Sequence, residues 1–479
     1  MTYASINPFN NKLIKKYPYA TDSEVEQALD KAQKAFFKWK NTPVKKRAQI
    51  FKQAAKLIRD DASELGRIAT QEMGATLQST TKQAYNTGAG MLDWLADNAQ
   101  KALTPKRLPV PTTDSDTLVT YAPQGIVLSI EPWNVPYYQA IRGFGPAAIA
   151  GNVVILKHAS IVPKSAQAIV DSLKKAGLPE GVWQNLRLSH KQTDRIISDP
   201  RMRQLTLTGS VGAGSHVSSL AGKHLRKSVL ELGGADPFIV LDNADLKLAV
   251  QGAMQRFYYV SGQICTSPKR MIIGGKLYDK FIIGLKQAGK AIRPGNPMLK
   301  ETNLGPLSSQ NQADIVKSQI KKAVENGASE TEIGPKVPTT GAFVQPTILT
   351  NVTSNNPVFH EEIFGPVPMI FKVNSDKEAI KLANDSPFGL SSNVYSSDTA
   401  RAVKVANQLD SGMNSINAPF ASTYPGQPFG GTKNSGFGRE MGIEGIRDFT
   451  NIKPIALPQG DHGNYSKELS SPKEMQEEV

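Results

Sequence analysis

One thiol stands out among the side chains that could do chemistry. Cys265 is the only cysteine in 479 residues and lies in the stretch VSGQICTSPKR (260–270). It has no cysteine partner for an internal disulfide, so it is either a buried hydrophobic residue or a nucleophile. A thiolate that adds to a carbonyl carbon divides one difficult reaction into two easier ones. A free thiol has a pKa of about 8.5, so the site must activate it; Lys269 and Arg270 are candidate cations for this.

Two further polar side chains stand where predicted strands end. Glu231 closes the apolar run in VLELGGADPF (229–238), and Asn134 lies in the turn of SIEPWNVPYY (129–138). A carboxylate in an apolar run is rarely buried without a partner. Glu231 is therefore either an ion-pair partner or a general base with a raised pKa. The amide of Asn134 either donates to an oxyanion or satisfies the backbone of its turn.

Two more stretches carry turn residues at predicted strand ends. LTLTGSVGAG (205–214) reads as a strand, a turn and a helix, and HEEIFGPV (360–367) carries Glu361 and Glu362 before a Gly-Pro turn. The first turn holds Gly209, Ser210 and Gly214. Glycines in such a turn let the backbone approach a pyrophosphate at a helix N-terminus, although an N-cap by Ser210 explains the pattern equally well.

The elements that must position these residues alternate along the chain. Residues 21–102 are predicted to be helical, beginning with the capping box TDSE (21–24), and 106–117 is a proline-rich extended crossing. From residue 125, short apolar runs alternate with helical stretches, and a second set of this kind begins near residue 235. Such alternation predicts parallel sheets, whose strand ends bind ligands.

The composition limits the class of protein. The net charge is +14, but the lysines are spread over helical faces with no block of five like charges, so we expect no nucleic-acid partner. The sequence contains no run of about 18 apolar residues, so no membrane span is predicted. No metal site is expected, because there is one cysteine and neither an HxxxH nor a CxxC motif. One thiol and no leader favour the cytoplasm.

The motifs occur together in one order. EPWN, VVILK, TLTGS, LELGG, GQIC, EEIFGP and PFGGTKNSGFGRE (428–440) follow one another, and Glu231 and Cys265 are 34 residues apart. Over residues 1–457 the chain resembles the aldehyde dehydrogenase superfamily. The resemblance implies an α/β fold with a Rossmann-like parallel-sheet cofactor domain, an α/β catalytic domain and a β-strand oligomerisation arm. The implied boundaries are 1–106 and 124–234 with a return near 430–450 for the first, 235–429 for the second, 107–123 and 451–458 for the arm, and 459–479 for a polar tail.

The resemblance also implies roles for individual residues. Cys265 matches the nucleophile, Glu231 the base that hydrolyses the acyl-enzyme, and Asn134 the oxyanion donor. NAD or NADP is the implied cofactor and a homodimer or homotetramer the implied assembly. The cofactor-binding positions are Ile130, Pro132, Trp133, Lys157, Ser160, Gly209, Ser210, Gly214, Glu362 and Phe364.

Within the superfamily the chain is most similar to bacterial succinate-semialdehyde dehydrogenases, through LKHAS, DPFIVL and KNSGFGRE. Many NAD-preferring relatives have glutamate where Ser160 stands, so NADP is expected to be accepted. Tyr259 stands where those enzymes often have arginine. Arg142, Tyr138 and Tyr259 are the predicted substrate-binding residues; Arg142 either binds a distal carboxylate or pairs with an acid on a neighbouring helix. The alternatives are another short-chain or broad-specificity aldehyde dehydrogenase, a CoA-acylating relative, which the presence of Glu231 disfavours, and a catalytically silent binding protein.

Overall fold

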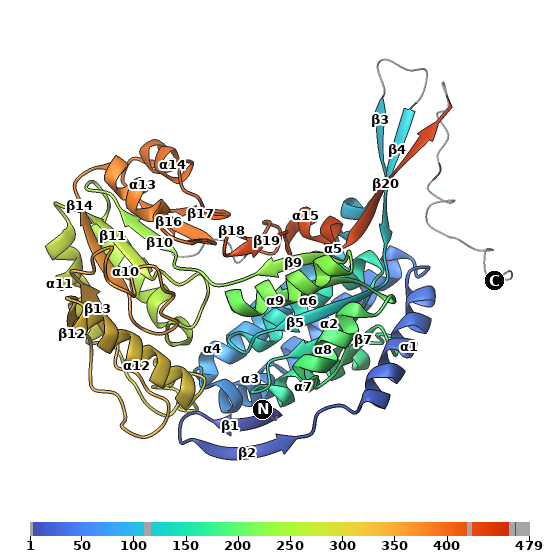
Figure 1. The fold of residues 1–479 in the computed structure, drawn as a ribbon, viewed down its shortest axis with the longest axis horizontal. Helices are drawn as coiled ribbons and strands as arrows, with labels where there is room; N and C mark the ends of the chain where they lie inside the picture. The colour runs from blue at the N-terminus through green and yellow to red at the C-terminus, as the bar shows by residue number, and fades with distance from the viewer. Residues whose placement is uncertain (1–2, 110–115, 419–423, 459–464, 466–479) are drawn as a thin grey trace.

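The computed structural model describes residues 3–109, 116–418, 424–458 and 465. Two α/β lobes lie side by side, and a three-stranded arm projects from one of them (Figure 1). The predicted α/β fold class is therefore confirmed. Apart from position 465, the predicted polar tail lies outside the described residues.

The first lobe is built on a six-stranded sheet. Its strands pair in parallel except for β19, which is antiparallel to β9. The β5 sequence IVLSIE is almost wholly buried, as expected for a sheet covered by helices on both faces. In spatial order the strands are β19 (Gly436–Phe437), β9 (Lys227–Glu231), β8 (Met202–Thr208), β5 (Ile126–Glu131), β6 (Val153–His158) and β7 (Trp183–Asn185).

Helices from two parts of the chain cover this sheet. The predicted capping box is confirmed at the start of α1, where the Thr21 side chain and the Glu24 carboxylate bind each other's backbone N–H groups. The helical segments are α1 (Asp22–Trp39), α2 (Val44–Asp60), α3 (Ala62–Met73), α4 (Leu77–Lys82), the π-helical η1 (Gln83–Gly88), α5 (Ala89–Leu103), α6 (Pro136–Ala150), α7 (Pro163–Lys175), α8 (His190–Ser198), α9 (Val211–Lys223) and α15 (Gly442–Asp448).

The second lobe is built on a seven-stranded sheet. Along β10, Phe238 and Val240 belong to one hydrophobic core and Ile239 to another, so alternate residues pack against helices on opposite faces. In spatial order the strands are β12 (Ser329–Glu332), β13 (Thr347–Thr350), β14 (Met369–Val373), β11 (Arg270–Gly274), β10 (Pro237–Val240), β16 (Ser391–Tyr395) and β17 (Met413–Ile416). The helices are α10 (Leu246–Tyr258), the 3₁₀ turn η2 (Tyr259–Gly262), α11 (Tyr278–Gly289), α12 (Gln310–Glu325), α13 (Asp376–Asn384) and α14 (Thr399–Ala406).

The arm is a separate antiparallel sheet. Strand β4 (Asp116–Pro123) lies between β3 (Lys106–Pro109) and β20 (Thr450–Leu457), so β3 and β20 are its edges. Two small sheets complete the fold, one of β1 (Tyr3–Asn7) and β2 (Lys12–Tyr17), the other of β15 (Phe388–Gly389) and β18 (Thr432–Lys433). No helix in the described ranges is both long enough and apolar enough to cross a bilayer.

A short connection joins the two large sheets. Strand β9 ends at Glu231 and β10 begins at Pro237. The carboxyl end of the first sheet therefore leads directly to the amino end of the second. The site lies at this junction, between the segments that leave β5, β8 and β9 and those that enter β11 and β14.

Candidate active site

A cavity of 280 Å³ lies at the junction of the two sheets. It collects predicted residues from four segments that are far apart in the sequence. Those predicted residues are Pro132, Trp133, Asn134, Gly209, Ser210, Cys265, Glu362 and Phe364. Gln139, Thr208, Leu232, Gly233 and Gln312 complete the lining. The cavity therefore joins the thiol, the amide and the turn that the sequence singled out.

Cys265 is half-buried between η2 and β11. Burial raises the pKa of its thiol to about 11, while the cations of Arg142 and Lys269 act in the opposite direction. Lys269 is buried, and its ammonium group lies 3.7 Å from the Glu362 carboxylate. Arg270 instead stacks on the ring of Phe359 and donates to a carbonyl oxygen of α13, so it does not face the thiol. Only one of the two candidate cations thus belongs to the site.

The backbone just before Cys265 is held in an uncommon conformation. Val260 and Ser261 have φ angles of 52° and 53°, a left-handed conformation that costs a β-branched residue roughly 1–3 kcal/mol. The Ser261 hydroxyl donates to the carbonyl oxygen of Gly305 at 2.8 Å and fixes this turn. A Cβ on Gly262 would lie 2.3 Å from the carbonyl oxygen of Gly365. Glycine is therefore required here by the chain's own backbone.

Asn134 connects the β5–α6 turn to the thiol loop. Its Nδ2 donates to the carbonyl oxygen of Gln263 at 2.9 Å, and its Oδ1 accepts from Gln139 at 3.3 Å. A primary amide has two N–H bonds, so one remains available. Because Asn134 lines the same cavity as Cys265, this second N–H can reach an oxygen held in that cavity.

Glu231 is the last residue of β9 and is only 1% exposed. Neither of its carboxyl oxygens has a hydrogen-bond partner in the described part of the chain. Burial raises the pKa of Glu231 well above its usual value, and the charge of Glu440 adds to this effect. Its side chain does not line the cavity, although Leu232 and Gly233, which follow it, do. The carboxyl must therefore turn to reach a group bound beside Cys265.

The N-terminus of α9 borders the cavity. Ser210 caps the helix by accepting from the N–H of Ala213, so the capping interpretation is confirmed. No atom lies within 4 Å of the position that a Cβ would take on Gly212, so the first helical turn faces open space. In the same cavity, Glu362 accepts from the N–H of Gly234 at 3.0 Å, and Phe364 packs edge-on against Trp133. An open helix N-terminus and a carboxylate that border one cavity fit a dinucleotide.

The remaining cofactor candidates are not among the residues that line this cavity. Ile130 and Lys157 are neighbours on β5 and β6, and burial lowers the pKa of Lys157. The carbonyl oxygen of Ser160 accepts from the N–H of Ala4. Gly214 lies in α9 and faces the side chain of Leu232.

Arg142 lies in a buried ion pair, the alternative that the sequence left open. Its Nε is 2.6 Å from Oε2 of Glu440, in the segment before α15, and its Nη2 donates to the Thr208 hydroxyl at 2.8 Å. The guanidinium also stacks on the ring of Phe429, 4.3 Å from its centroid. The acid comes from a segment preceding a helix and not from the helix that was expected.

The two predicted substrate tyrosines lie apart. The hydroxyl of Tyr138 contacts the sulfur of Met441 at 2.9 Å, and burial raises its pKa to about 12. Tyr259 lines a second cavity, of 530 Å³, where its hydroxyl interacts with Ser79 and Gln83. It therefore faces the helices before α5 and not the cavity of Cys265.

Sequence reasoning missed several polar residues near the site. Thr208 and Gln139 line the cavity, and Glu131 and Glu440 are buried beside it. A usable signal existed for Glu131, because it ends the apolar run IVLSIE as Glu231 ends its own run. Nothing local marks Glu440, whose partner Arg142 is distant in the sequence.

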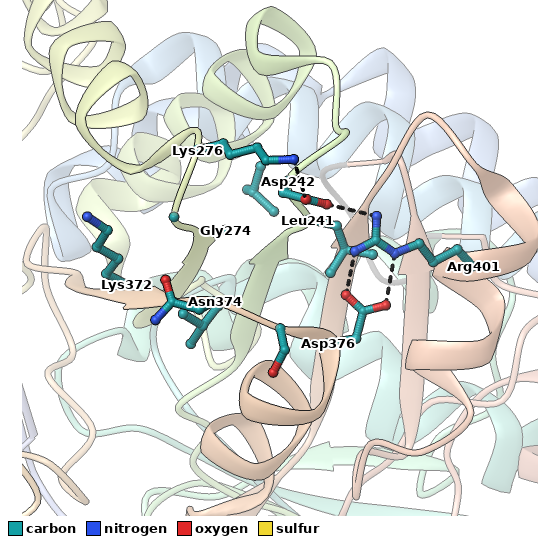
Figure 2. A pocket seen from close by; sticks show the side chains of 12 residues that line it. Leu241, Asp242, Gly274, Lys276, Lys372, Asn374, Asp376 and Arg401 are labelled. Carbon is teal, nitrogen blue, oxygen red and sulfur yellow. Dashed lines mark hydrogen bonds and ion pairs between the residues drawn. The ribbon is translucent and has the colours of Figure 1, made fainter.

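A larger pocket of 640 Å³ lies at the carboxyl ends of β10, β11 and β14, at the far edge of the second sheet (Figure 2). Arg401 binds both carboxylate oxygens of Asp376 and also reaches Asp242, which Lys276 approaches at 3.4 Å. The hydrogen bond from Arg401 lowers the pKa of Asp242. These carboxylates are thus paired with cations, unlike the carboxyl of Glu231 near Cys265.

Comparison with known proteins agrees with this geometry. The sequence model of the aldehyde dehydrogenase family matches residues 1–455. The chain belongs to the aldehyde dehydrogenase family. It is 41% identical to a succinate-semialdehyde dehydrogenase (NADP+) from Deinococcus radiodurans, over 95% of this chain and 94% of that protein. It is 39% identical to an aldehyde dehydrogenase from Paenarthrobacter nicotinovorans, over 95% and 99% of the two chains.

Among solved structures, the succinic semialdehyde dehydrogenase of Streptococcus pyogenes in complex with NADP+ superposes with a TM-score of 0.92. It is 37% identical and covers 95% of this aldehyde dehydrogenase chain and 100% of its own. The recognition made from the motifs is thus confirmed. The activity of this aldehyde dehydrogenase is NAD(P)-dependent oxidation of an aldehyde to a carboxylic acid.

Proposed function

We propose that this aldehyde dehydrogenase oxidises succinate semialdehyde to succinate, with Cys265 as nucleophile and Glu231 as the base of deacylation. The observation that carries the proposal is that Cys265 and Asn134 line one cavity, next to the open N-terminus of α9. The names of the relatives in Deinococcus and Streptococcus support the choice of substrate.

The first step is the addition of the thiolate to the aldehyde carbon. Because burial raises the pKa of Cys265, the thiol must lose its proton as the substrate binds, and Arg142 and Lys269 favour the charged form. The aldehyde oxygen then becomes an oxyanion. The second N–H of Asn134 and the backbone N–H of Cys265 are the donors assigned to it, and one such donor is commonly worth about 10²–10³ in rate.

A nicotinamide cofactor, when bound, would supply the hydride acceptor. The N-terminus of α9 and Ser210 are assigned to the pyrophosphate, and Glu362 and Lys157 to the two riboses. Ser160 carries no charge that would repel a 2′-phosphate, and Lys157 stands nearby on β6. NADP is therefore proposed as an accepted cofactor.

The last step is hydrolysis of the thioester on Cys265. Glu231 takes a proton from a water molecule as that water attacks the acyl carbon. A carboxyl without partners is suited to this task, because a base with a raised pKa accepts a proton readily near neutral pH. The carboxyl must first turn past Leu232 into the cavity.

A second candidate substrate is a short-chain aldehyde without a carboxylate. The pairing of Arg142 with Glu440 and the direction of Tyr259 favour it, because neither side chain is free to bind a distal carboxylate in this conformation. For succinate semialdehyde, the substrate carboxylate would have to compete with Glu440 for the guanidinium.

We also propose a closed homo-oligomer formed through the arm, and a cytoplasmic location. Strand β20 is an eight-residue edge with exposed apolar side chains such as Ile452, and such edges pair readily with another chain. A single cysteine suits a reducing compartment.

Product analysis tests this proposal. Purified protein is incubated with succinate semialdehyde or butanal, with NAD or NADP, and with or without CoA. Succinate formed with NADP and independently of CoA is the expected result. Preference for butanal by kcat/KM would favour the second candidate, and an acyl-CoA product would contradict hydrolysis by Glu231. Light scattering at micromolar concentration checks the assembly.

A further inference from the structure

Three buried carboxyl groups share one buried cation beside the active site. Glu131, Glu231 and Glu440 are at most 2% exposed, and Arg142 is 1% exposed. Taking an unpaired charge out of water costs several kcal/mol. The cluster therefore cannot hold three negative charges, and the carboxyls that carry protons have to be identified.

The strand register brings two of these carboxyls to either side of Thr208. Thr208 is in register with Glu231 on β9. On its other side, the pairing of Ile130 with Leu207 sets Glu131 beside Thr208. Neighbouring strands are about 4.8 Å apart, and residues in register point to the same face. Thr208 thus lies between Glu131 and Glu231. Because Thr208 also lines the cavity, it connects Glu131 to that cavity.

The ion pair accounts for one negative charge. Arg142 forms an ion pair with Glu440, with its Nε 2.6 Å from Oε2, and its Nη2 donates to the Thr208 hydroxyl. The Thr206 hydroxyl contacts the other oxygen of Glu440. With two polar partners, Glu440 is the carboxylate that neutralises the guanidinium. Among the described residues, Arg142 is the cation that acts on Glu131, and it is already paired with Glu440.

The immediate surroundings of Glu131 favour its neutral form, because burial outweighs the few groups that stabilise a charge. Its Oε1 is 2.7 Å from the Ser129 hydroxyl, and its Oε2 has no hydrogen-bond partner in the described part of the chain. A Cβ on Gly143 would lie 2.1 Å from Oε1, so helix α6 packs directly on the carboxyl. Burial raises the pKa of Glu131 well above its usual value and Glu440 adds to this, against Arg142, Ser129 and Thr208.

His158, the neighbour of Glu131 on β6, supplies no cation either. Its Nδ1 accepts from the N–H of Ala159 and its Nε2 donates to the carbonyl oxygen of Pro136, which is the neutral tautomer. Burial lowers its pKa to about 4. The polar and charged groups that face Glu131 are thus Ser129 on its own strand, His158 on β6, Thr208 on β8, Glu231 on β9, Arg142 on α6 and Glu440 before α15.

We propose that Glu131 holds a proton in the working enzyme and is a positioning residue for deacylation. As a neutral group it occupies the space beside Ser129 and Thr208 and keeps Thr208 and the Arg142–Glu440 pair in place. An ionised Glu131 would set a second negative charge on the face where Glu231 must ionise to act as base. The kinetic part of this inference rests on the proposed role of Glu231; the location of the proton does not.

Infrared spectroscopy locates the proton. Near neutral pH, the difference between the spectra of the wild type and Glu131→Gln is expected to show the C=O stretching band of a protonated carboxyl. Carboxylate bands in that difference would overturn the proposal. The measurement needs no turnover, so it holds whether or not Glu231 is the base.

Single-turnover hydrolysis of the thioester, followed against pH, tests the positioning role. Glu131→Gln copies the neutral acid in shape, so its rate should stay within about threefold of the wild type with the acid limb of the profile unmoved. Glu131→Leu removes the polar contacts and should be about tenfold slower, with the cofactor Kd unchanged, the size expected for one lost hydrogen bond. An acid limb moved to lower pH in Glu131→Gln would mean that Glu131 is ionised, and a wild-type rate in Glu131→Leu would mean that it positions nothing.

The two variants separate the possible failures. If Glu131→Leu does not fold, the infrared difference and the pH profile of Glu131→Gln still test whether Glu131 holds a proton. If Glu231→Gln hydrolyses the thioester at the normal rate, the assigned base is wrong while the infrared result for Glu131 still stands.

Discussion

The carboxyl ends of the two large sheets hold acidic groups in opposite states. On the six-stranded sheet, Glu131 and Glu231 are buried, and Glu231 has no hydrogen-bond partner in the described part of the chain. On the seven-stranded sheet, Asp242 and Asp376 are half-exposed and bound by Arg401 (Figure 2). The two sets of strand ends differ in position. Only the carboxyl ends of the six-stranded sheet face the other lobe and meet the loop of Cys265.

This contrast distinguishes strand ends that serve the reaction from strand ends that serve only the structure. Leaving a buried carboxyl without partners costs about 1–3 kcal/mol or more, which a purely structural site has no reason to retain. The ion pairs around Arg401 are near water, where each contributes little. The larger pocket thus lies at the strand ends where the acidic groups are paired with cations. The smaller cavity lies at the strand ends where a buried carboxyl has no hydrogen-bond partner.

The largest expected effect is at the thiol. Cys265→Ala should abolish aldehyde oxidation, because no covalent intermediate can form. The Kd for NADP, measured by fluorescence titration, should change little, since Cys265 is only one of the groups that line the cavity. Turnover at the wild-type rate would rule out covalent catalysis by this residue.

Removing the base should slow one step by about 10²–10⁴-fold. Glu231→Gln keeps the side-chain shape but cannot accept a proton, so rapid-mixing absorbance should show a burst of reduced cofactor followed by slow turnover. The matched change at the other edge, Asp376→Asn, should leave kcat as it was. Equal losses in the two variants would remove the contrast between the edges.

Replacing Arg142 or Arg401 should lower the free energy of unfolding by different amounts. Arg142→Leu leaves Glu440 buried without its cation and should cost about 3–5 kcal/mol, whereas Arg401→Leu, near the surface, should cost about 1 kcal/mol. Thermal melting measures both. If Arg142 serves only structure, its variant loses similar kcat/KM for succinate semialdehyde and butanal; a loss confined to the semialdehyde would assign it to the substrate.

The smallest effect concerns the pH at which the thiol reacts. Because burial raises the pKa of Cys265 to about 11, the thiol is protonated near neutral pH without cofactor. Its rate of alkylation should therefore keep rising as the pH increases past the usual thiol range. Lys269→Met removes a cation that lowers this pKa, so alkylation at a fixed alkaline pH should slow by roughly threefold to tenfold. A plateau near pH 8 would contradict the raised pKa.

Strands, caps and turns could be predicted from the sequence because they are local patterns. A capping box, a buried strand such as IVLSIE and a glycine turn are read within a few residues. The partner of Arg142 is not of this kind, since Glu440 is brought to it by the return of the chain to the first lobe. Glu131 shows a different limit of sequence-based prediction. It ends an apolar run just as Glu231 does, but only the strand register around Thr208 shows which residues lie beside it.

The return of the chain through β19 has a consequence for how the protein is made. Strand β19 pairs with β9, opposite Glu231 itself, after the whole second lobe has been inserted between them. During synthesis the edge of β9 stays open, and Arg142 lacks its counter-ion, until the segment ending at Glu440 leaves the ribosome. A chain interrupted before that point carries a complete Cys265 loop but an unfinished sheet with an open edge, which exposes it to aggregation and quality control. The nascent enzyme therefore completes its reactive centre only after the segment that ends at Glu440 has been made.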